Sequence, residues 1–300
     1  MELGKKWVAA AVAPVSRIAE ALLVSRQSLY KVQRIRQAVR RPRPRPVMRE
    51  LDLDVQVGPE HLAPEEALVV LARRHVAYGY RRLWAKLRRA GYVINRKRVQ
   101  RLLRLWGYGL TRPRPHPKAQ GRPFDVSAPN QLWQTDMTAI WCGEDGWGYL
   151  TAVLDCFDRS MLGWSMTPHC RARDFSPAME MAWSTAWPYG PETPPTVVLR
   201  HDNGTQFTSE HYREVAQRLG IRLSRTRYRH PDGNALVERI FLSLKQEEVW
   251  PQDYASFAEA QAAVTDWILD YNTERPHQSL KYRTPAEVRQ EALGSTQSAA

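Results

Sequence analysis

The arrangement of strand and helix patterns after Pro129 most constrains what this chain can fold into. Three runs of strand-forming residues separated by short turns predict three consecutive strands, at 132–141, 148–154 and 161–167. A short apolar run at 196–199 suits a buried parallel strand, and 221–224 predicts a further strand after a helix at 209–219. A strand meander followed by alternating helix and strand predicts an α/β fold with a mixed sheet flanked by helices.

Charge is distributed unevenly along the sequence. Residues 1–120 carry 27 Lys and Arg against 8 Asp and Glu, whereas residues 121–300 carry 17 against 23. This asymmetry suggests a basic N-terminal part that binds phosphates and a body with another task. A merely solvated basic surface is the alternative. The composition, 43% hydrophobic and 25% charged, is typical of a soluble globular protein, and we expect a cytoplasmic one.

The cysteines and histidines argue against a zinc module. Cys142, Cys156 and Cys170 are odd in number and form no Cys-x-x-Cys pair, which fits a reducing compartment. The eight His residues show no pairing with Cys at zinc-finger spacing. We therefore expect any DNA-binding module here to work without zinc.

Two basic, proline-rich stretches, at 40–46 and 112–118, read as semi-rigid linkers that divide the chain. The predicted parts are a helix-turn-helix DNA-binding segment with its linker, a helical DNA-binding module, a second linker, the α/β body with a C-terminal helix and a flexible tail, at 1–46, 60–110, 111–128, 129–290 and 291–300.

The first helical part, residues 14–39, has the pattern of a helix-turn-helix, with Ser16 and Ser25 as candidate helix caps. Its second helix would present polar side chains to a major groove, among them Arg26, Gln27, Lys31 and Arg34. An ordinary basic helical hairpin is the alternative.

The second helical module predicts helices at about 64–76, 80–90 and 96–106. Its third helix turns cations outward, and Arg81 and Arg82 of the second helix join them as candidate DNA ligands. The outward cations of the third helix are Arg96, Lys97, Arg98, Arg101 and Arg104.

Three acids stand at positions where carboxylates are functional in α/β proteins. Asp136 sits within a strand, where a charge needs a partner, and Asp202 follows a strand end, where ligands bind. Glu238 falls in the first turns of a helix that begins near Asn234. Asp155 and Asp158, near a strand end and a turn, are rival candidates on chemistry alone.

Carboxylate oxygens suit hard cations such as Mg²⁺ or Mn²⁺. Two ions about 3.5–4 Å apart can activate the attacking oxygen and stabilise the leaving oxygen at phosphorus. Lys245 lies two turns along the helix on the side of Glu238, where it can grip a DNA phosphate. Alternatively, Lys245 only balances Glu247 and Glu248 on an exposed helix.

Several motifs in order are similar to those of OrfB-type insertion-sequence transposases with a retroviral-integrase-like core. Asp202 and Glu238, with 35 residues between them, complete with Asp136 the Asp-Asp-35-Glu signature. The surrounding motifs are Trp133-x-x-Asp136, Asp155-x-x-x-Arg159-x-x-x-Gly163-Trp164, Asp202-Asn203-Gly204-x-Gln206-Phe207, Pro231-x-Gly233-Asn234-x-x-x-Glu238 and Tyr271-Asn272-x-x-Arg275-Pro276-His277. Upstream, Tyr78-Gly79-Tyr80-Arg81-Arg82 and Asn95-x-Lys97-Arg98-Val99 resemble the helical module that precedes this core.

The resemblance implies an RNase H-like five-stranded core whose acids Asp136, Asp202 and Glu238 converge on two Mg²⁺ ions. It implies that the protein hydrolyses a phosphodiester at the end of the mobile DNA element. The 3′-OH freed in this way then attacks a second phosphodiester. Carried over by position, Lys245 would bind terminal DNA and Asn234 would help shape the active site, and both are expected among the DNA-binding residues. The chain departs from the family at His201, where Ser is common.

The expected partners are the double-stranded terminal inverted repeats, target DNA, further copies of this chain and an upstream OrfA-type helix-turn-helix protein. We expect the protein to associate with the bacterial nucleoid. The alternative function is that of a catalytically inactive, transposase-derived DNA-binding protein. A tyrosine recombinase is disfavoured because no His has Arg three positions later. A simple RNase H or resolvase would not need the two basic modules.

Overall fold

The protein is described here from a computed structural model, which covers residues 62–108, 126–191, 195–202, 204–226 and 234–297. The helix-turn-helix expected at 14–39, with Arg26, Gln27, Lys31 and Arg34, lies outside the described residues. The described residues before Leu105 and from Tyr108 onward belong to one compact unit. Within the described part of the chain, no helix is long and apolar enough to cross a membrane.

The three helices of the N-terminal module confirm the prediction to within two residues. They are α4 (Pro64–Arg74), α5 (Tyr80–Arg89) and α6 (Arg96–Leu105). The side chain of Asn95 accepts a hydrogen bond from the backbone N–H of Lys97, at 2.8 Å, at the start of α6. Leu83 and Leu87 form the buried side of α5, and Val99 and Leu103 form the buried side of α6. These buried faces leave the cations of α6 exposed.

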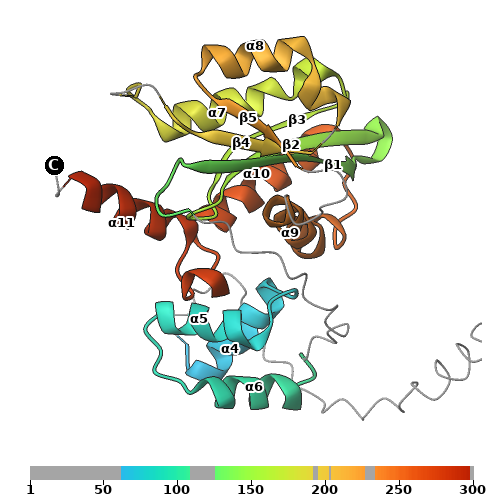
Figure 1. The fold of residues 1–300 in the computed structure, drawn as a ribbon. Helices are drawn as coiled ribbons and strands as arrows, with labels where there is room; N and C mark the ends of the chain where they lie inside the picture. Colours follow the sequence, from blue (N-terminus) through green and yellow to red (C-terminus); the bar gives the residue numbers. More distant parts are fainter. Residues whose placement is uncertain (1–61, 109–125, 192–194, 203, 227–233, 298–300) are drawn as a thin grey trace, which may run out of the picture. The chain divides into compact units, whose positions relative to one another are not determined.

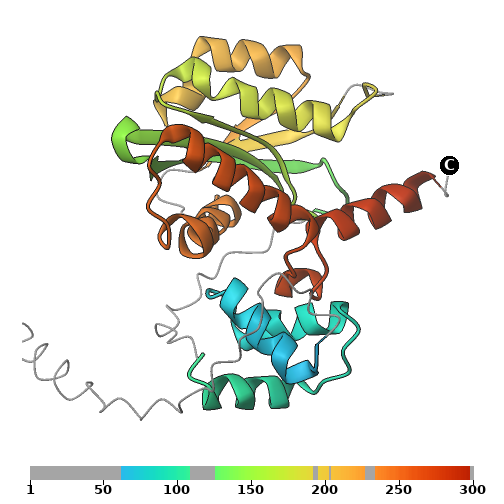
Figure 2. The ribbon, with the colours of Figure 1, turned by 180° about the vertical axis from the view of Figure 1, so that it is seen from behind.

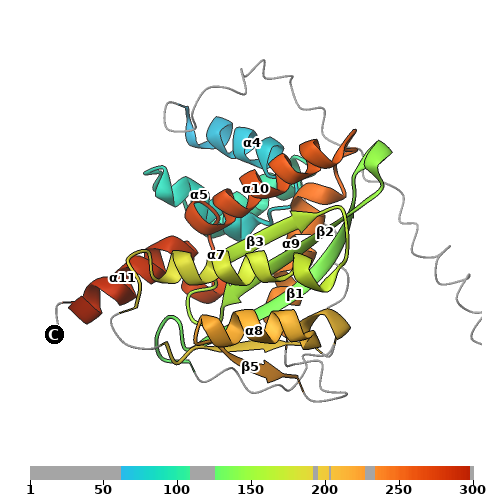
Figure 3. The ribbon, with the colours of Figure 1, turned by 90° about the horizontal axis from the view of Figure 1, so that it is seen from above.

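The α/β body contains the expected mixed sheet, seen from above in Figure 3. The strands lie in the order β3-β2-β1-β4-β5. Their bounds are Leu132–Trp141 for β1, Trp147–Asp155 for β2, Met161–Thr167 for β3, Val198–His201 for β4 and Arg222–Arg225 for β5. The central strand β1 is antiparallel to β2 and parallel to β4. The strand predicted at 196–199 lies two residues later, because pairing with β1 begins at Val198.

Helices cover both faces of the sheet, as Figures 1 and 2 show from opposite sides. Helices α7 (Ser176–Ala186) and α8 (Glu210–Arg218) pack on one face, and α9 (Ala235–Leu244) and α10 (Phe257–Thr273) pack on the other. Side chains of β1 alternate between the two cores: Trp133 enters the α7–α8 core, and Ile140 enters the α9–α10 core. This alternation turns Asp136 to the side that carries α9.

The last helix, α11 (Pro285–Gln297), is tied to the turn between β2 and β3. Arg289 donates to Asp158 Oδ2 at 2.8 Å and to Asp155 Oδ2 at 3.3 Å. Both carboxylates are fully buried. The ion pairs therefore hold the C-terminal helix against the end of the sheet.

Candidate active site

Asp136 stands near the middle of β1 and is half-buried. Burial, followed by the like charges of Asp202 and Glu238, raises the pKa of the Asp136 carboxyl to about 6. The backbone N–H of Met137 donates to Asp136 Oδ1 at 2.8 Å and opposes that rise. Asp136 is thus a half-buried carboxyl that lies within the influence of two other acids.

Asp202 follows the carboxyl end of β4, which lies parallel to β1 with Gln134 opposite Arg200. This register places Asp202 alongside Asp136, at the neighbouring strand's end. The backbone N–H of Gly204 donates to Asp202 Oδ1 at 2.9 Å and orients the carboxylate within a tight turn. The strand-end location matches where α/β sheets bind ligands.

Glu238 lies in the first turn of α9, which packs on the face of β1 that carries Asp136. Burial and the charge of Asp202 raise the pKa of the Glu238 carboxyl. The N-terminal end of a helix favours a negative side chain. The three predicted acids thus come from a central strand, the end of its neighbour and a covering helix. The charges of Asp202 and Glu238 act on Asp136, and the charge of Asp202 acts on Glu238.

The donor set of this acid cluster fits a divalent cation. Three carboxylates that repel one another gain stability when a cation shares their oxygens, and hard cations prefer such ligands. Among the described residues, no three His, Cys, Asp or Glu side chains already stand close enough together to form a metal cluster. The fit therefore rests on the charge and chemistry of the three acids.

His201, the residue immediately before Asp202, has a packing role. Its ring is almost completely buried, 5.5 Å from the ring of Phe207. Burial lowers the pKa of His201, so the ring is neutral near pH 7. Its Nδ1 lies 2.6 Å from the carbonyl oxygen of Asp202, and the neutral ring donates its proton there. This hydrogen bond fixes the backbone of Asp202, the acid that follows His201 in the sequence.

The rival acids Asp155 and Asp158 are fully engaged elsewhere. The two oxygens of Asp155 accept from the N–H groups of Phe157 and Asn130, each at 2.8 Å. Asp158 accepts from the N–H of Ser160 and from Arg289, also at 2.8 Å. Neither carboxylate keeps an oxygen without a protein partner, so both serve the attachment of α11.

The predicted DNA ligands occupy different environments. Asn234 is buried at the N-cap of α9, and its side chain reaches the backbone of β1 rather than the surface. The side chain of Asn234 thus joins the start of α9 to the central strand. Lys245 is half-buried at the end of α9, where the π-helical turn η6 (Lys245–Val249) begins.

The remaining described candidates lie on α5 and α6. Arg82 forms an ion pair with Glu247 at 2.7 Å, and Arg81 donates to Gln278 at 3.3 Å. On α6, Arg98 is paired with Glu65. The cations of α6 are all exposed: Arg96, Lys97, Arg98, Arg101 and Arg104.

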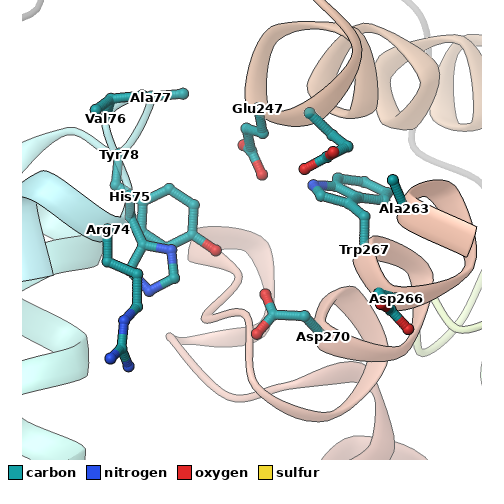
Figure 4. Close-up of a pocket in the computed structure, with 11 residues that line it drawn as sticks. Arg74, His75, Val76, Ala77, Tyr78, Glu247, Ala263, Asp266, Trp267 and Asp270 are labelled. Atoms are coloured by element: carbon teal, nitrogen blue, oxygen red, sulfur yellow. The ribbon is translucent and has the colours of Figure 1, made fainter. Parts of the chain in front are cut away.

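A pocket apart from the acid cluster is lined by the turn after α4 and by η6 and α10 (Figure 4). His75 and Tyr78 stand on one side, and Glu247, Trp267 and Asp270 stand on the other. Because none of the three predicted acids lines it, this pocket is separate from the candidate active site. From the sequence, Glu247 was expected only to balance the charge of Lys245, because its burial arises from contacts with the distant residues Arg82 and Arg275.

Comparison with known proteins bears on both the fold and the site. Two integrase core domain families match residues 126–231 and 219–285, and an HTH-like domain family matches residues 64–116. The mixed five-stranded sheet with flanking helices is that of an RNase H-like integrase core. The fold and these matches define a polynucleotidyl transferase of the integrase type, a class that uses divalent metal ions.

Relatives identify the family. The transposase for insertion sequence element IS904 of Lactococcus lactis subsp. lactis is 30% identical over 224 residues, covering 70% of this chain and 86% of that protein. Transposase InsF for insertion sequence IS3A of Escherichia coli is 33% identical over 225 residues, covering 70% and 76%. The chain belongs to the family of insertion-sequence transposases, which act on DNA in transposition and integration.

A solved structure with similarity to this chain is the HTLV-2 integrase catalytic core domain in complex with magnesium. It is 18% identical, with a TM-score of 0.39, and the alignment covers 54% of this chain and 97% of that one.

Proposed function

We propose that Asp136, Asp202 and Glu238 hold two Mg²⁺ ions and form the catalytic site of a DNA transposase. The observation that carries the proposal is that β1, the end of β4 and the first turn of α9 bring the three acids into one region. Burial, together with the charge of neighbouring acids, raises the pKa values of Asp136 and Glu238 there. Such ions, when bound, activate the attacking oxygen and stabilise the leaving oxygen in an in-line displacement at phosphorus. The same site serves cleavage at the element end and transfer of that end to target DNA.

In this proposal the protein supplies position and charge. Asp136 provides a ligand on the central strand, and sites on regular elements are more precise than sites on long loops. Asp202 provides a ligand on the adjacent turn, where the N–H of Gly204 orients its carboxylate. Glu238 provides the third ligand from α9. Lys245, which follows α9, grips a phosphate of the terminal DNA, and Asn234 shapes the active site.

The proposal also assigns the DNA-binding surface and the assembly. Arg96, Lys97 and Arg101 lie exposed on α6 and are available to phosphates. Further DNA ligands in this proposal are Arg26, Gln27, Lys31, Arg34, Arg81, Arg82 and Arg98. The proposal also includes the division of the chain into five parts, at 1–46, 60–110, 111–128, 129–290 and 291–300.

Transposition brings two DNA ends together, so we expect a dimer or larger assembly on DNA. An upstream OrfA-type protein is the expected partner, and the cytoplasm, at the nucleoid, is the expected location.

The proposal is tested by divalent-metal-dependent cleavage of a plasmid that bears the element's flanking ends. Wild type is compared with Asp202→Asn and with the matched control Glu210→Gln, which changes an exposed acid on α8. Nicks at the ends with Mg²⁺ or Mn²⁺, absent for Asp202→Asn and present for Glu210→Gln, are expected. Equal cleavage by Asp202→Asn would contradict the metal role of that acid. End binding without cleavage by wild type would favour the DNA-binding protein without catalysis.

A further inference from the structure

The helix that carries Glu238 begins without a cap of its own. Asn234 occupies the N-cap position of α9, but its side chain accepts no hydrogen bond from the helix. Its Nδ2 instead donates to the carbonyl oxygen of Thr135 in β1, at 3.0 Å. The first N–H groups of any helix lack intrahelical acceptors, so buried ones need an acceptor from elsewhere.

Gln134 of β1 is that acceptor. Its Oε1 receives the N–H groups of Leu236 at 3.2 Å and of Val237 at 3.3 Å, the second and third residues of α9. These are the groups that an N-cap side chain normally satisfies. Gln134 is fully buried and lies 102 residues before Leu236 in the sequence. The cap of α9 is therefore a tertiary contact with the central strand.

The hydrogen bonds made by Asn234 and by Gln134 connect residues next to Asp136 with residues next to Glu238. On β1 they start from Gln134 and Thr135, which immediately precede Asp136. On α9 they end at Asn234 and at the two residues directly before Glu238. Alternation along the strand places Gln134 and Asp136 on the same face of β1, toward α9.

We infer that Gln134 is a positioning residue, which sets where Glu238 stands opposite Asp136 by capping α9 from the central strand. This inference rests on the proposed metal role of the two acids. Gln134 itself touches neither DNA nor metal in this account. Its amide holds the helix while adding no charge beside Asp136.

The chemistry of the cap defines the informative variants. Gln134→Leu keeps the volume of the side chain but leaves two buried N–H groups without an acceptor. Gln134→Asn keeps the amide but is one methylene shorter, so it cannot reach both N–H groups without a shift of the helix. Thr138→Val is the matched control, because Thr138 lies equally far from Asp136 on the same strand and face and is also buried.

The experiment measures end cleavage of the plasmid at saturating DNA as Mg²⁺ and, separately, Mn²⁺ are varied. A displaced ligand lowers metal affinity or rate about 10-fold to 100-fold, by analogy with outer groups that orient metal ligands. We expect Gln134→Leu and Gln134→Asn to need more Mg²⁺ for half-maximal rate and to regain rate in Mn²⁺. Binding of end DNA without metal is unchanged in all variants.

The outcomes separate this inference from the proposed function. If wild type itself shows no metal-dependent cleavage, the proposed function fails before Gln134 is tested. If wild type cleaves and a folded Gln134→Leu or Gln134→Asn protein keeps the wild-type Mg²⁺ response, the inference is wrong and the proposed function stands. A shift as large in Thr138→Val would likewise refute it, because general disturbance of β1 would then explain the effect. Should the leucine variant not fold, the asparagine variant carries the test.

Discussion

Glu247 lies at the centre of a buried ion-pair network with Arg275 and Arg82. Substituting each of these residues should destabilise the fold by a different amount. Its carboxylate receives Arg275 in two bonds, from Nε at 2.8 Å and from Nη2 at 2.6 Å, and receives Arg82 Nη1 at 2.7 Å. The side chains of Glu247 and Arg275 are 8% and 4% exposed, whereas that of Arg82 is 29% exposed. One carboxylate thus neutralises two cations, of which one is deeply buried.

The cost of each substitution follows from the charge that remains. Glu247→Gln leaves Arg275 buried without a counter-charge and beside a second cation, so we expect a loss of about 3–5 kcal/mol in the free energy of unfolding. Arg275→Met leaves Glu247 paired with Arg82, so we expect a smaller loss of about 2–3 kcal/mol. Arg82→Met removes a partly exposed partner and should cost about 1 kcal/mol.

Urea denaturation followed by tryptophan fluorescence measures these losses, with equal slopes required for comparison. The double variant Glu247→Gln with Arg275→Met should lose less than the sum of the single losses, because the second change removes the unpaired cation left by the first. A loss below about 1 kcal/mol for Glu247→Gln, or one no larger than that of Arg82→Met, would refute the reasoning.

Two other predictions concern packing and acid stability. Gly163→Ala should destabilise the fold by at least about 1–3 kcal/mol in urea denaturation, because a Cβ there would meet the carbonyl of Ala178 at 2.1 Å; an unchanged midpoint would contradict this contact. Burial lowers the pKa of His277 from 6.5 to about 3. Between these pH values His277 is protonated in the unfolded chain and neutral in the folded chain. Stability should therefore fall as pH drops from 7 to 5, and His277→Gln should reduce that fall by about 2 kcal/mol; the same fall in both proteins would count against it.

The elements that local patterns encode were predictable from the sequence. The alternation in 132–141 predicted β1 at its observed bounds, and the helical periodicity predicted α4 to α6 within two residues. Asp202 was predicted to follow a strand, and it follows β4. In each case the signal lies within a dozen residues and does not depend on distant partners.

The contacts that orient the site could not be predicted in this way. Gln134 reads as an ordinary strand residue, and only its pairing with the start of α9 reveals the cap. Glu247 reads as a surface charge until Arg275 is brought beside it. Asp155 and Asp158 remained rivals of the catalytic acids until Arg289 was seen to engage them. All of these depend on residues brought together by the tertiary fold, for which local periodicity holds no signal.

The central claim is that one cluster of three acids performs the transfer of DNA strands. The most direct measurement is strand transfer of a pre-cut element-end oligonucleotide into supercoiled plasmid, which bypasses the first cleavage. Wild type is compared with Asp136→Asn, Asp202→Asn and Glu238→Gln in Mg²⁺. The account predicts joined products for wild type and their loss, with DNA binding retained, in all three variants. Joining at the wild-type rate by any one of them would contradict it.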